Sequence, residues 1–114
     1  PQLDIHLHLH ETRGLGLANV YAALQEGLWE FDTAIGGLGG CPFAAVKGAP
    51  GNIATEDVAF LCEQMGIDTG LNLAALVDCA NKAEQLVGRA LPGHLAKGGL
   101  QEHVRPKTWK QVQG

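Results

Sequence analysis

The chain has 114 residues, of which 46% are hydrophobic and 18% charged, and its net charge is −4. This composition excludes a disordered chain and is typical of at most one folded domain. The sequence has no run of Lys or Arg and no stretch of roughly 18 apolar residues, which argues against nucleic acid and membranes as partners.

The first predicted elements are a strand and a helix. Residues 3–9 alternate between apolar and polar side chains, the period of a strand, with His6 and His8 on one face. The opposite face carries Leu3, Ile5, Leu7 and Leu9. Two glycines end this pattern, and apolar residues at helical spacing then predict a helix over residues 17–26.

A second strand and two further helices follow. Residues 29–35 are predicted to form a strand, and the stretch 36–52 is too rich in Gly and Pro for a regular element. Thr55 is expected to N-cap a helix that ends near residue 65, and Asn72 is expected to N-cap a helix over residues 73–87.

The order strand, helix, strand, helix predicts two adjacent parallel strands joined by a right-handed crossover. Because parallel sheets are covered on both faces, two such strands do not make a stable sheet alone. A (β/α)8 barrel takes about 250 residues, so this chain would supply two of its eight units. The chain starts at Pro1 and its only methionine is Met65, which favours a piece of a longer protein. The missing units would then lie on another chain, be lost, or be replaced by self-association.

Three of the five histidines alternate in the sequence IHLHLHET, residues 5–12. Alternate residues of a strand point to one side about 6.6 Å apart, so His8 and His10 can converge on one metal ion. A packed or hydrogen-bonded structural pair is the alternative. The pair ends a strand and precedes a glycine turn, where α/β proteins build their sites, which favours the metal site. His6 lies deeper on the same face and is interpreted as interior filling or support.

The glycine-rich stretch contains one cysteine, Cys41. A thiol in a glycine loop after a strand is suited to donating or accepting a proton. Asn52 closes the loop, either as an ordinary turn residue or as a metal ligand through its carbonyl oxygen. Cys62 and Cys79 are expected to fill the core. Three cysteines without a CxxC pair favour a reducing compartment, and we expect a cytoplasmic protein.

Five segments of the sequence resemble the C-terminal part of the 3-hydroxy-3-methylglutaryl-CoA (HMG-CoA) lyase family. They are HLHET, GLANVYAAL, FDTAIGGLGGCPFA, GAPGN and ATEDVAFL, and the resemblance covers about residues 5–90. GGLGGCPFA, the signature loop of these lyases, is the most specific, whereas the HxH element is shared with related synthases. The resemblance implies an α/β fold, with the last two βα units and the C-terminal helix of a TIM (β/α)8 barrel in residues 1–90 and an irregular tail in 91–114.

The resemblance also implies a function. Enzymes of this family cleave HMG-CoA to acetyl-CoA and acetoacetate, a retro-Claisen reaction of leucine degradation, with Mg²⁺ or Mn²⁺ as cofactor. His8, His10 and Asn52 match the family's metal ligands, and Cys41 matches a cysteine that takes part in proton transfer. Cys41 and His8 are therefore the implied catalytic residues. The implied partners are an acyl-CoA substrate and either the remaining barrel segment or further copies in a homo-oligomer.

The sequence departs from the family pattern in three respects. Glu11 stands where these families usually have Asp, and the loop between Cys41 and Asn52 is longer than usual, which would move the cysteine relative to the metal. The remaining metal ligand, an aspartate preceded by a catalytic arginine, has no match in this chain. The chain alone is therefore expected to be inactive. Two alternatives remain: a lyase for another 3-hydroxyacyl-CoA, and an inactive barrel fragment that binds a divalent ion. The further charged residues interpreted as solvated or structural are Asp32, Lys47, Glu56, Asp57 and Arg89.

Overall fold

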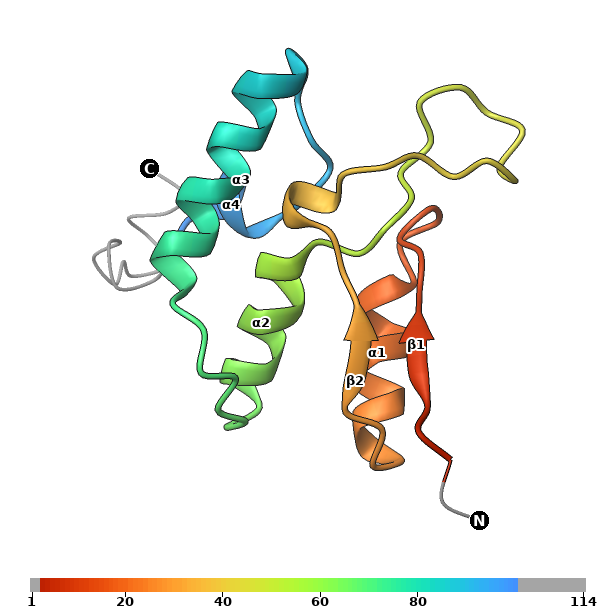
Figure 1. Cartoon of the computed structure of the whole chain (residues 1–114), viewed down its shortest axis with the longest axis vertical. Helices are drawn as coiled ribbons and strands as arrows, with labels where there is room; N and C mark the ends of the chain where they lie inside the picture. Colours follow the sequence, from red (N-terminus) through yellow and green to blue (C-terminus); the bar gives the residue numbers. More distant parts are fainter. Residues whose placement is uncertain (1–2, 101–114) are drawn as a thin grey trace, which may run out of the picture.

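The computed structural model describes residues 3–100, in which two parallel strands are covered on one face by helices (Figure 1). Strands β1 (His6–His8) and β2 (Glu30–Asp32) pair in parallel, and helix α1 (Gly16–Gln25) connects them. The predicted pair of adjacent parallel strands is confirmed. Both strands point toward the glycine-rich loop, which extends away from the helices.

The paired strands end earlier than predicted because residues 50–54 enter between their carboxyl ends, and β1 also begins later, at His6 instead of residue 3. His10, just after β1, forms an antiparallel bridge with Asn52. Ala34, just after β2, forms a parallel bridge with Ala54. Each strand end therefore bonds to this segment instead of to the other strand. We call residues 50–54 the return arm, since they bring the glycine-rich loop back to the sheet.

Helices α2 (Thr55–Gln64) and α3 (Leu73–Val87) confirm the two helices predicted for the second half of the chain. Asn72 caps α3 as predicted, because its Oδ1 accepts a hydrogen bond from the backbone N–H of Ala75 at 3.0 Å. Gly88 ends α3 with a φ of 72°, a left-handed conformation that glycine adopts without strain.

The start of α2 differs from the prediction. Ala54 occupies the N-cap position and Thr55 is the first helical residue, so the N-cap expected at Thr55 is wrong. The Thr55 hydroxyl is hydrogen-bonded to the hydroxyl of Thr33 at 2.7 Å. Bonding across to the segment after β2 uses the hydroxyl that a cap would need, and it ties α2 to the sheet.

The hydrophobic core lies between one face of the sheet and helices α1 and α2. Its buried residues are Val20, Leu24, Ile53, Val58 and Cys62, and Leu9 and Phe31 pack against them from the strand side. Cys62 fills the core as expected. Cys79 does not, because it lies on the exposed side of α3.

Residues 91–100 are mostly irregular, with a single helical turn, α4 (Leu95–Gly98). Leu91, Leu95 and Leu100 are nevertheless buried. Leu91 packs on the short 3-10 turn η1 (Ile35–Gly37) that opens the glycine-rich loop, so closely that a Cβ at Gly36 would lie 2.6 Å from it. No helix within residues 3–100 is both long enough and apolar enough to cross a membrane.

Candidate metal centre

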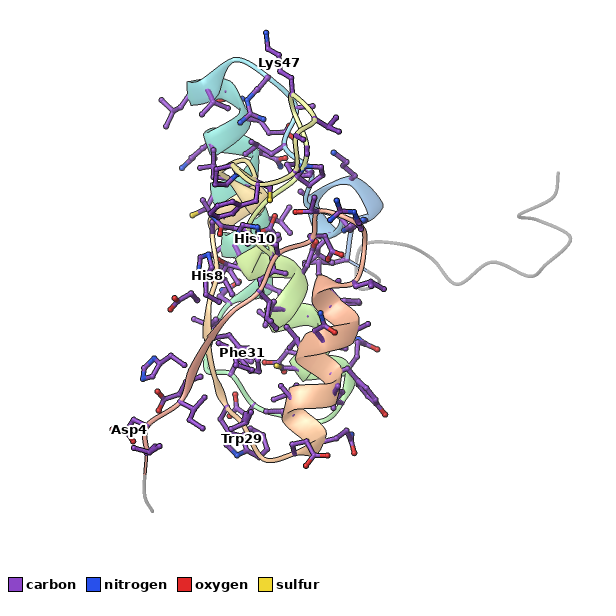
Figure 2. All side chains as sticks on the ribbon, turned by 90° about the vertical axis from the view of Figure 1, so that its right-hand side faces the viewer. Asp4, His8, His10, Trp29, Phe31 and Lys47 are labelled. Carbon is purple, nitrogen blue, oxygen red and sulfur yellow. The ribbon has the colours of Figure 1, made fainter. Side chains whose placement is uncertain are left out.

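The imidazole rings of His8 and His10 converge at the carboxyl end of β1 (Figure 2). Their Nε2 atoms are 3.2 Å apart, and the ring centroids are 5.1 Å apart with 61° between the planes. His10 follows His8 by two residues in an extended segment, so both side chains leave the backbone on the same side. Two ring nitrogens at this distance can share one proton or bind one cation.

Asn52 reaches the same place from the return arm, where the bridge to His10 holds its backbone beside β1. Its Nδ2 donates a hydrogen bond to the backbone oxygen of Leu38 at 2.9 Å, which leaves Oδ1 to accept a hydrogen bond or bind a cation. Gly39 makes room for this amide. It has a φ of 99°, and a Cβ there would lie 2.7 Å from the Asn52 Nδ2.

A hollow of about 580 Å³ opens beside these groups. Its lining residues are His8, Leu9, His10, Gly40, Pro42, Phe43 and Asn52. Two imidazole nitrogens and one amide oxygen form a donor set that fits a divalent cation such as Mg²⁺, Mn²⁺ or Zn²⁺. Within residues 3–100, no three His, Cys, Asp or Glu side chains come together in a way that could hold a metal ion. The described residues could therefore supply only part of a coordination sphere, and the residues that could do so are His8, His10 and Asn52.

Cys41 does not line this hollow, but the next two residues, Pro42 and Phe43, do. The thiol therefore lies close to the hollow. The thiol is partly exposed and lies next to the hydroxyl of Thr12. Hydrogen bonding that the Thr12 hydroxyl and the Phe43 N–H can offer to the sulfur lowers the pKa of the thiol. In the structure the single hydrogen of the Thr12 hydroxyl is donated to the backbone oxygen of Pro50 at 2.7 Å, so this hydroxyl stabilises a thiolate fully only after turning to the sulfur.

Glu11, the residue that departs from the family pattern, holds the start of α1. Its Oε1 accepts a hydrogen bond from the N–H of Gly16, the first residue of α1, at 3.0 Å. No side chain at the N-cap residue Leu15 does this, so Glu11 satisfies a helix N–H and places negative charge at the positive end of the helix. The backbone N–H of Glu11 also donates to Gly51 of the return arm at 2.7 Å.

The uncovered face of the sheet carries two pairs of histidine and carboxylate side chains. The strand register sets His6 beside Glu30 and His8 beside Asp32. His6 Nε2 is in direct contact with Glu30 Oε2, and His8 Nδ1 lies 3.4 Å from Asp32 Oδ2. His6 therefore pairs with a carboxylate at one level below the convergent rings, and its interpretation as interior filling or support stays a prediction.

Two buried carboxylates on α2 form a structural unit whose burial the sequence did not reveal. Glu56 Oε1 accepts a hydrogen bond from the N–H of Gly36 in η1 at 2.9 Å, and burial raises the pKa of its carboxyl. Asp57 accepts hydrogen bonds from the N–H groups of His94 and Leu95 at 2.7–3.1 Å. Both residues are structural, as expected, and they hold the glycine-rich loop and residues 91–95 on α2.

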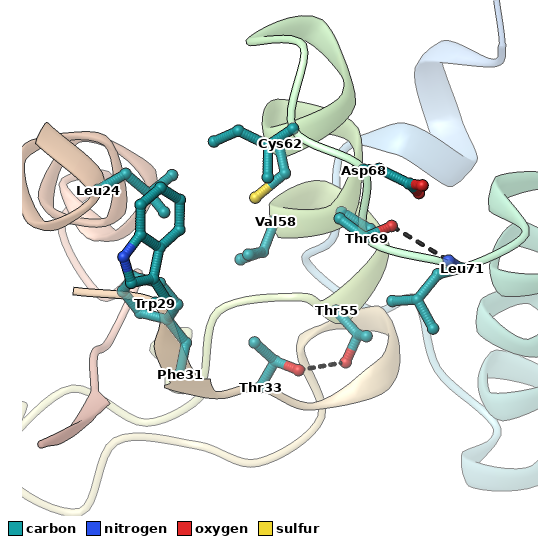
Figure 3. A pocket seen from close by; sticks show the side chains of 12 residues that line it. Leu24, Trp29, Phe31, Thr33, Thr55, Val58, Cys62, Asp68, Thr69 and Leu71 are labelled. Atoms are coloured by element: carbon teal, nitrogen blue, oxygen red, sulfur yellow. Dashed lines mark hydrogen bonds between the residues drawn. The ribbon is translucent and has the colours of Figure 1, made fainter. Parts of the chain in front are cut away.

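A second hollow lies at the edge of β2 (Figure 3). Trp29 and Phe31 of the strand side face Val58 and Cys62 of α2 across it. The hollow is mainly apolar, and the hydrogen-bonded hydroxyls of Thr33 and Thr55 lie at its floor. Its polar lining residues, Thr33, Thr55, Asp68 and Thr69, carry oxygen atoms, and no histidine within residues 3–100 lines it.

Comparison with known proteins gives consistent results over most of the chain. Residues 1–82 match the family model described as HMGL-like. The (R)-citramalyl-CoA lyase of Chloroflexus aurantiacus is 46% identical over 99 residues, which is 87% of this chain and 31% of that protein. A hydroxymethylglutaryl-CoA lyase of Bacillus subtilis is 48% identical over 92 residues, 81% of this chain and 30% of that protein.

Solved structures give the same picture. The structure of an HMG-CoA lyase from Acinetobacter baumannii in complex with coenzyme A and 3-methylmalate is 48% identical, with a TM-score of 0.78, over 90% of this chain and 33% of that one. The Bacillus subtilis HMG-CoA lyase structure is 45% identical, with a TM-score of 0.78, over 82% of this chain and 31% of that one. The chain thus spans about a third of the length of the relatives that it matches.

Proposed function

The chain belongs to the HMGL-like family, and from this membership we propose that it is part of a divalent-metal-dependent carbon–carbon lyase for HMG-CoA. The reaction would yield acetyl-CoA and acetoacetate. Because the chain spans about a third of its relatives, the rest of the enzyme would come from further polypeptide. A (β/α)8 barrel is the fold that we propose for the assembled protein, with β1, α1, β2 and α2 as two of its units.

One observation carries this proposal: His8, His10 and Asn52 present ring nitrogens and an amide oxygen to one hollow at the carboxyl ends of parallel strands. The carboxyl ends of strands are where α/β barrels place their sites. A divalent ion held there would supply positive charge where the hydroxyl of the substrate passes its proton to a base, which we expect from the remaining polypeptide. Donors of mixed nitrogen and oxygen type with open positions favour Mg²⁺ or Mn²⁺.

The protein's own side chains would then have two roles, binding the cation and donating a proton. His8, His10 and Asn52 bind and orient the cation, and cleavage of the carbon–carbon bond leaves a carbanion on the acetyl-CoA part. That carbanion takes up a proton to give acetyl-CoA. Cys41 is the proposed proton donor, because its thiol is partly exposed, has a lowered pKa, and lies on the loop whose residues line the hollow.

The open sheet supports the need for further strands. The face with His6 and His8 and the hollow lined by Trp29 and Phe31 are not covered by other residues of 3–100. Parallel sheets in stable proteins are covered on both faces. We propose that the remaining barrel strands, from a further segment or another subunit, cover them and supply the carboxylate that completes the metal site.

A chimera tests the function. The matching third of the Bacillus subtilis HMG-CoA lyase would be replaced with this chain, and cleavage of HMG-CoA measured with Mg²⁺ or Mn²⁺. We expect activity, with near-complete loss in a His8→Ala chimera. A Cys41→Ala chimera should lose about 10²- to 10⁴-fold in turnover while keeping its Mn²⁺ affinity, the effect of removing a general acid.

The same chimera distinguishes the alternatives. A folded chimera that binds Mn²⁺ but cleaves no CoA thioester would refute the proposal and favour an inactive metal-binding fragment. Cleavage of (R)-citramalyl-CoA in preference to HMG-CoA would assign the other substrate, which gives its name to one of the relatives. Loss of Mn²⁺ binding in the Cys41→Ala chimera would refute the role of the thiol.

A further inference from the structure

The side chains of His8 and Asp32 form an ion pair next to the proposed metal site. The two side chains are 56% and 63% exposed, and their contact at 3.4 Å is an ion-pair contact, longer than an ordinary N–H···O hydrogen bond. Exposed pairs of this kind add about 0–1 kcal/mol to stability. The contact is made by Nδ1, however, the ring nitrogen of His8 that faces away from His10. It therefore acts on the ring whose other nitrogen enters the proposed metal site.

The hydrogens of the two rings can be counted from the geometry. With the Nε2 atoms of His8 and His10 3.2 Å apart, one hydrogen must lie between them, because two lone pairs or two N–H groups would repel. A carboxylate only accepts hydrogen bonds, so Asp32 favours a hydrogen on Nδ1 of His8. A neutral His8 then has a lone pair on Nε2, and the shared hydrogen belongs to His10.

We propose that Asp32 is a positioning residue whose carboxylate, 3.4 Å from Nδ1 of His8, favours the hydrogen on that nitrogen and so keeps the Nε2 lone pair directed at the cation site. Metal-binding histidines commonly donate their other ring N–H to a carboxylate or carbonyl, which fixes the tautomer and raises the basicity of the ligand. This inference rests on the proposed metal site. Asp32 comes from β2, so the register of the two strands, and not the HxH sequence alone, prepares the site.

The neighbouring pair provides a matched control. His6 and Glu30 form a second histidine–carboxylate pair one level away on the same face, at similar exposure, but the contact is made by Nε2 of His6, and His6 is not among the proposed ligands. Asp32→Asn and Glu30→Gln each remove one negative charge with little change in shape. A general electrostatic effect would weaken cation binding similarly in both variants, whereas loss of positioning affects only Asp32→Asn.

Two measurements on the full chain test the inference. The first is the affinity for Mn²⁺ alone, from electron paramagnetic resonance of the free ion. We expect about 10-fold weaker binding in Asp32→Asn, the lower end for a residue that supports a ligand, and less than about 3-fold in Glu30→Gln, since exposed charges are screened. The second is ¹⁵N NMR of the His8 ring near pH 8, above the ordinary histidine pKa of about 6.5. We expect its hydrogen on Nδ1, and a mixture of tautomers in Asp32→Asn.

Each outcome decides a separate question. Equal losses of affinity in the two variants, or a His8 hydrogen on Nε2 in the unaltered chain, would overturn the role of Asp32. If the unaltered chain binds no Mn²⁺, the proposed metal site is refuted for this chain, and the His8 tautomer still decides whether Asp32 orients the ring. Circular dichroism of each variant shows whether the fold is retained, and the NMR measurement on the unaltered chain does not depend on any variant.

Discussion

Gly51 is the point at which the return arm leaves no room for a side chain. A Cβ at this residue would lie 2.4 Å from the backbone oxygen of Gly40 and 2.7 Å from that of Gly39. Because the obstacles are backbone atoms, they cannot rotate away as a side chain would. We therefore predict that Gly51→Ala forces the two arms of the glycine-rich loop apart.

The expected loss of stability follows from the contacts. Overpacking of this kind costs about 1–3 kcal/mol. The displaced Gly51 oxygen also accepts the hydrogen bond from Glu11 at 2.7 Å, whose loss costs about 1 kcal/mol. Together they predict a loss of about 2–4 kcal/mol, or at least about 8 °C in Tm for a domain of this size. Asn52 is the next residue, so Mn²⁺ binding should weaken as well.

Urea unfolding followed by circular dichroism measures the effect, and Gly40→Ala is the matched control. Gly40 lies on the opposite arm of the same loop, but a Cβ there meets its nearest atom, the oxygen of Ala49, at an ordinary 3.8 Å. We expect this variant to stay within about 1 kcal/mol of the parent. A Gly51→Ala protein that is as stable as the Gly40→Ala protein would show that the return arm is not held against the sheet as described.

Three further predictions concern buried or perturbed groups. Burial raises the pKa of Glu56 in the folded state, so between its unfolded and folded pKa the folded state binds more protons than the unfolded state. The free energy of unfolding should therefore fall as the pH rises from about 4 toward neutrality. Urea titrations at several pH values should show this fall in the parent and not in Glu56→Gln, and the same pH dependence in both proteins would contradict the prediction. Thr12→Val removes the main group that lowers the pKa of Cys41, so the midpoint of its alkylation rate against pH should move upward, while the exposed thiol on α3 should show no change. Leu91→Ala should cost about 2–5 kcal/mol in unfolding free energy because Leu91 is only 2% exposed, whereas Leu86→Ala, at an 88% exposed position of α3, should stay within about 0.5 kcal/mol; similar losses would show that residue 91 belongs to a loose tail.

The sequence was sufficient to predict the elements with regular periodicity. Alternation predicted the two strands and helical spacing predicted α1, whereas α2 and α3 were predicted from their expected start and stop residues, of which the cap at Asn72 is confirmed. The convergence of His8 and His10 was predictable for the same reason, since it depends only on the period of an extended chain. These features are local, and local chemistry is what a single sequence shows.

Features that depend on distant segments were not predictable. Nothing in the composition of the glycine-rich stretch indicates that residues 50–54 bond to both strand ends, and this contact shortens the paired strands. Thr55 was wrongly expected to be a cap because its hydroxyl has a partner 22 residues away, Thr33. Two adjacent acids at the start of a helix suggest only an interaction with the helix dipole, so the burial of Glu56 and Asp57 was also missed.

The contact between Asp32 and His8 was not predicted from the sequence, although a prediction of the strand register would have found it. The distance of Asp32 along the chain from His8 gives no hint of contact, but the parallel register sets the two residues side by side. A prediction of the register, with Leu7 opposite Phe31 as the apolar pair on the core side, would have found it. The strand register therefore identifies Asp32 as a neighbour of His8, which the order of residues along the chain does not reveal.

The position of Trp29 has a practical consequence. Its indole is 62% exposed and lines the hollow at the edge of β2, so a strand that docks there would remove the ring from water and shift its fluorescence to shorter wavelength. The sequence contains one other tryptophan, Trp109, outside the described residues. With that residue changed to Phe, emission from the single indole would give an optical titration of barrel completion, without substrate and without metal.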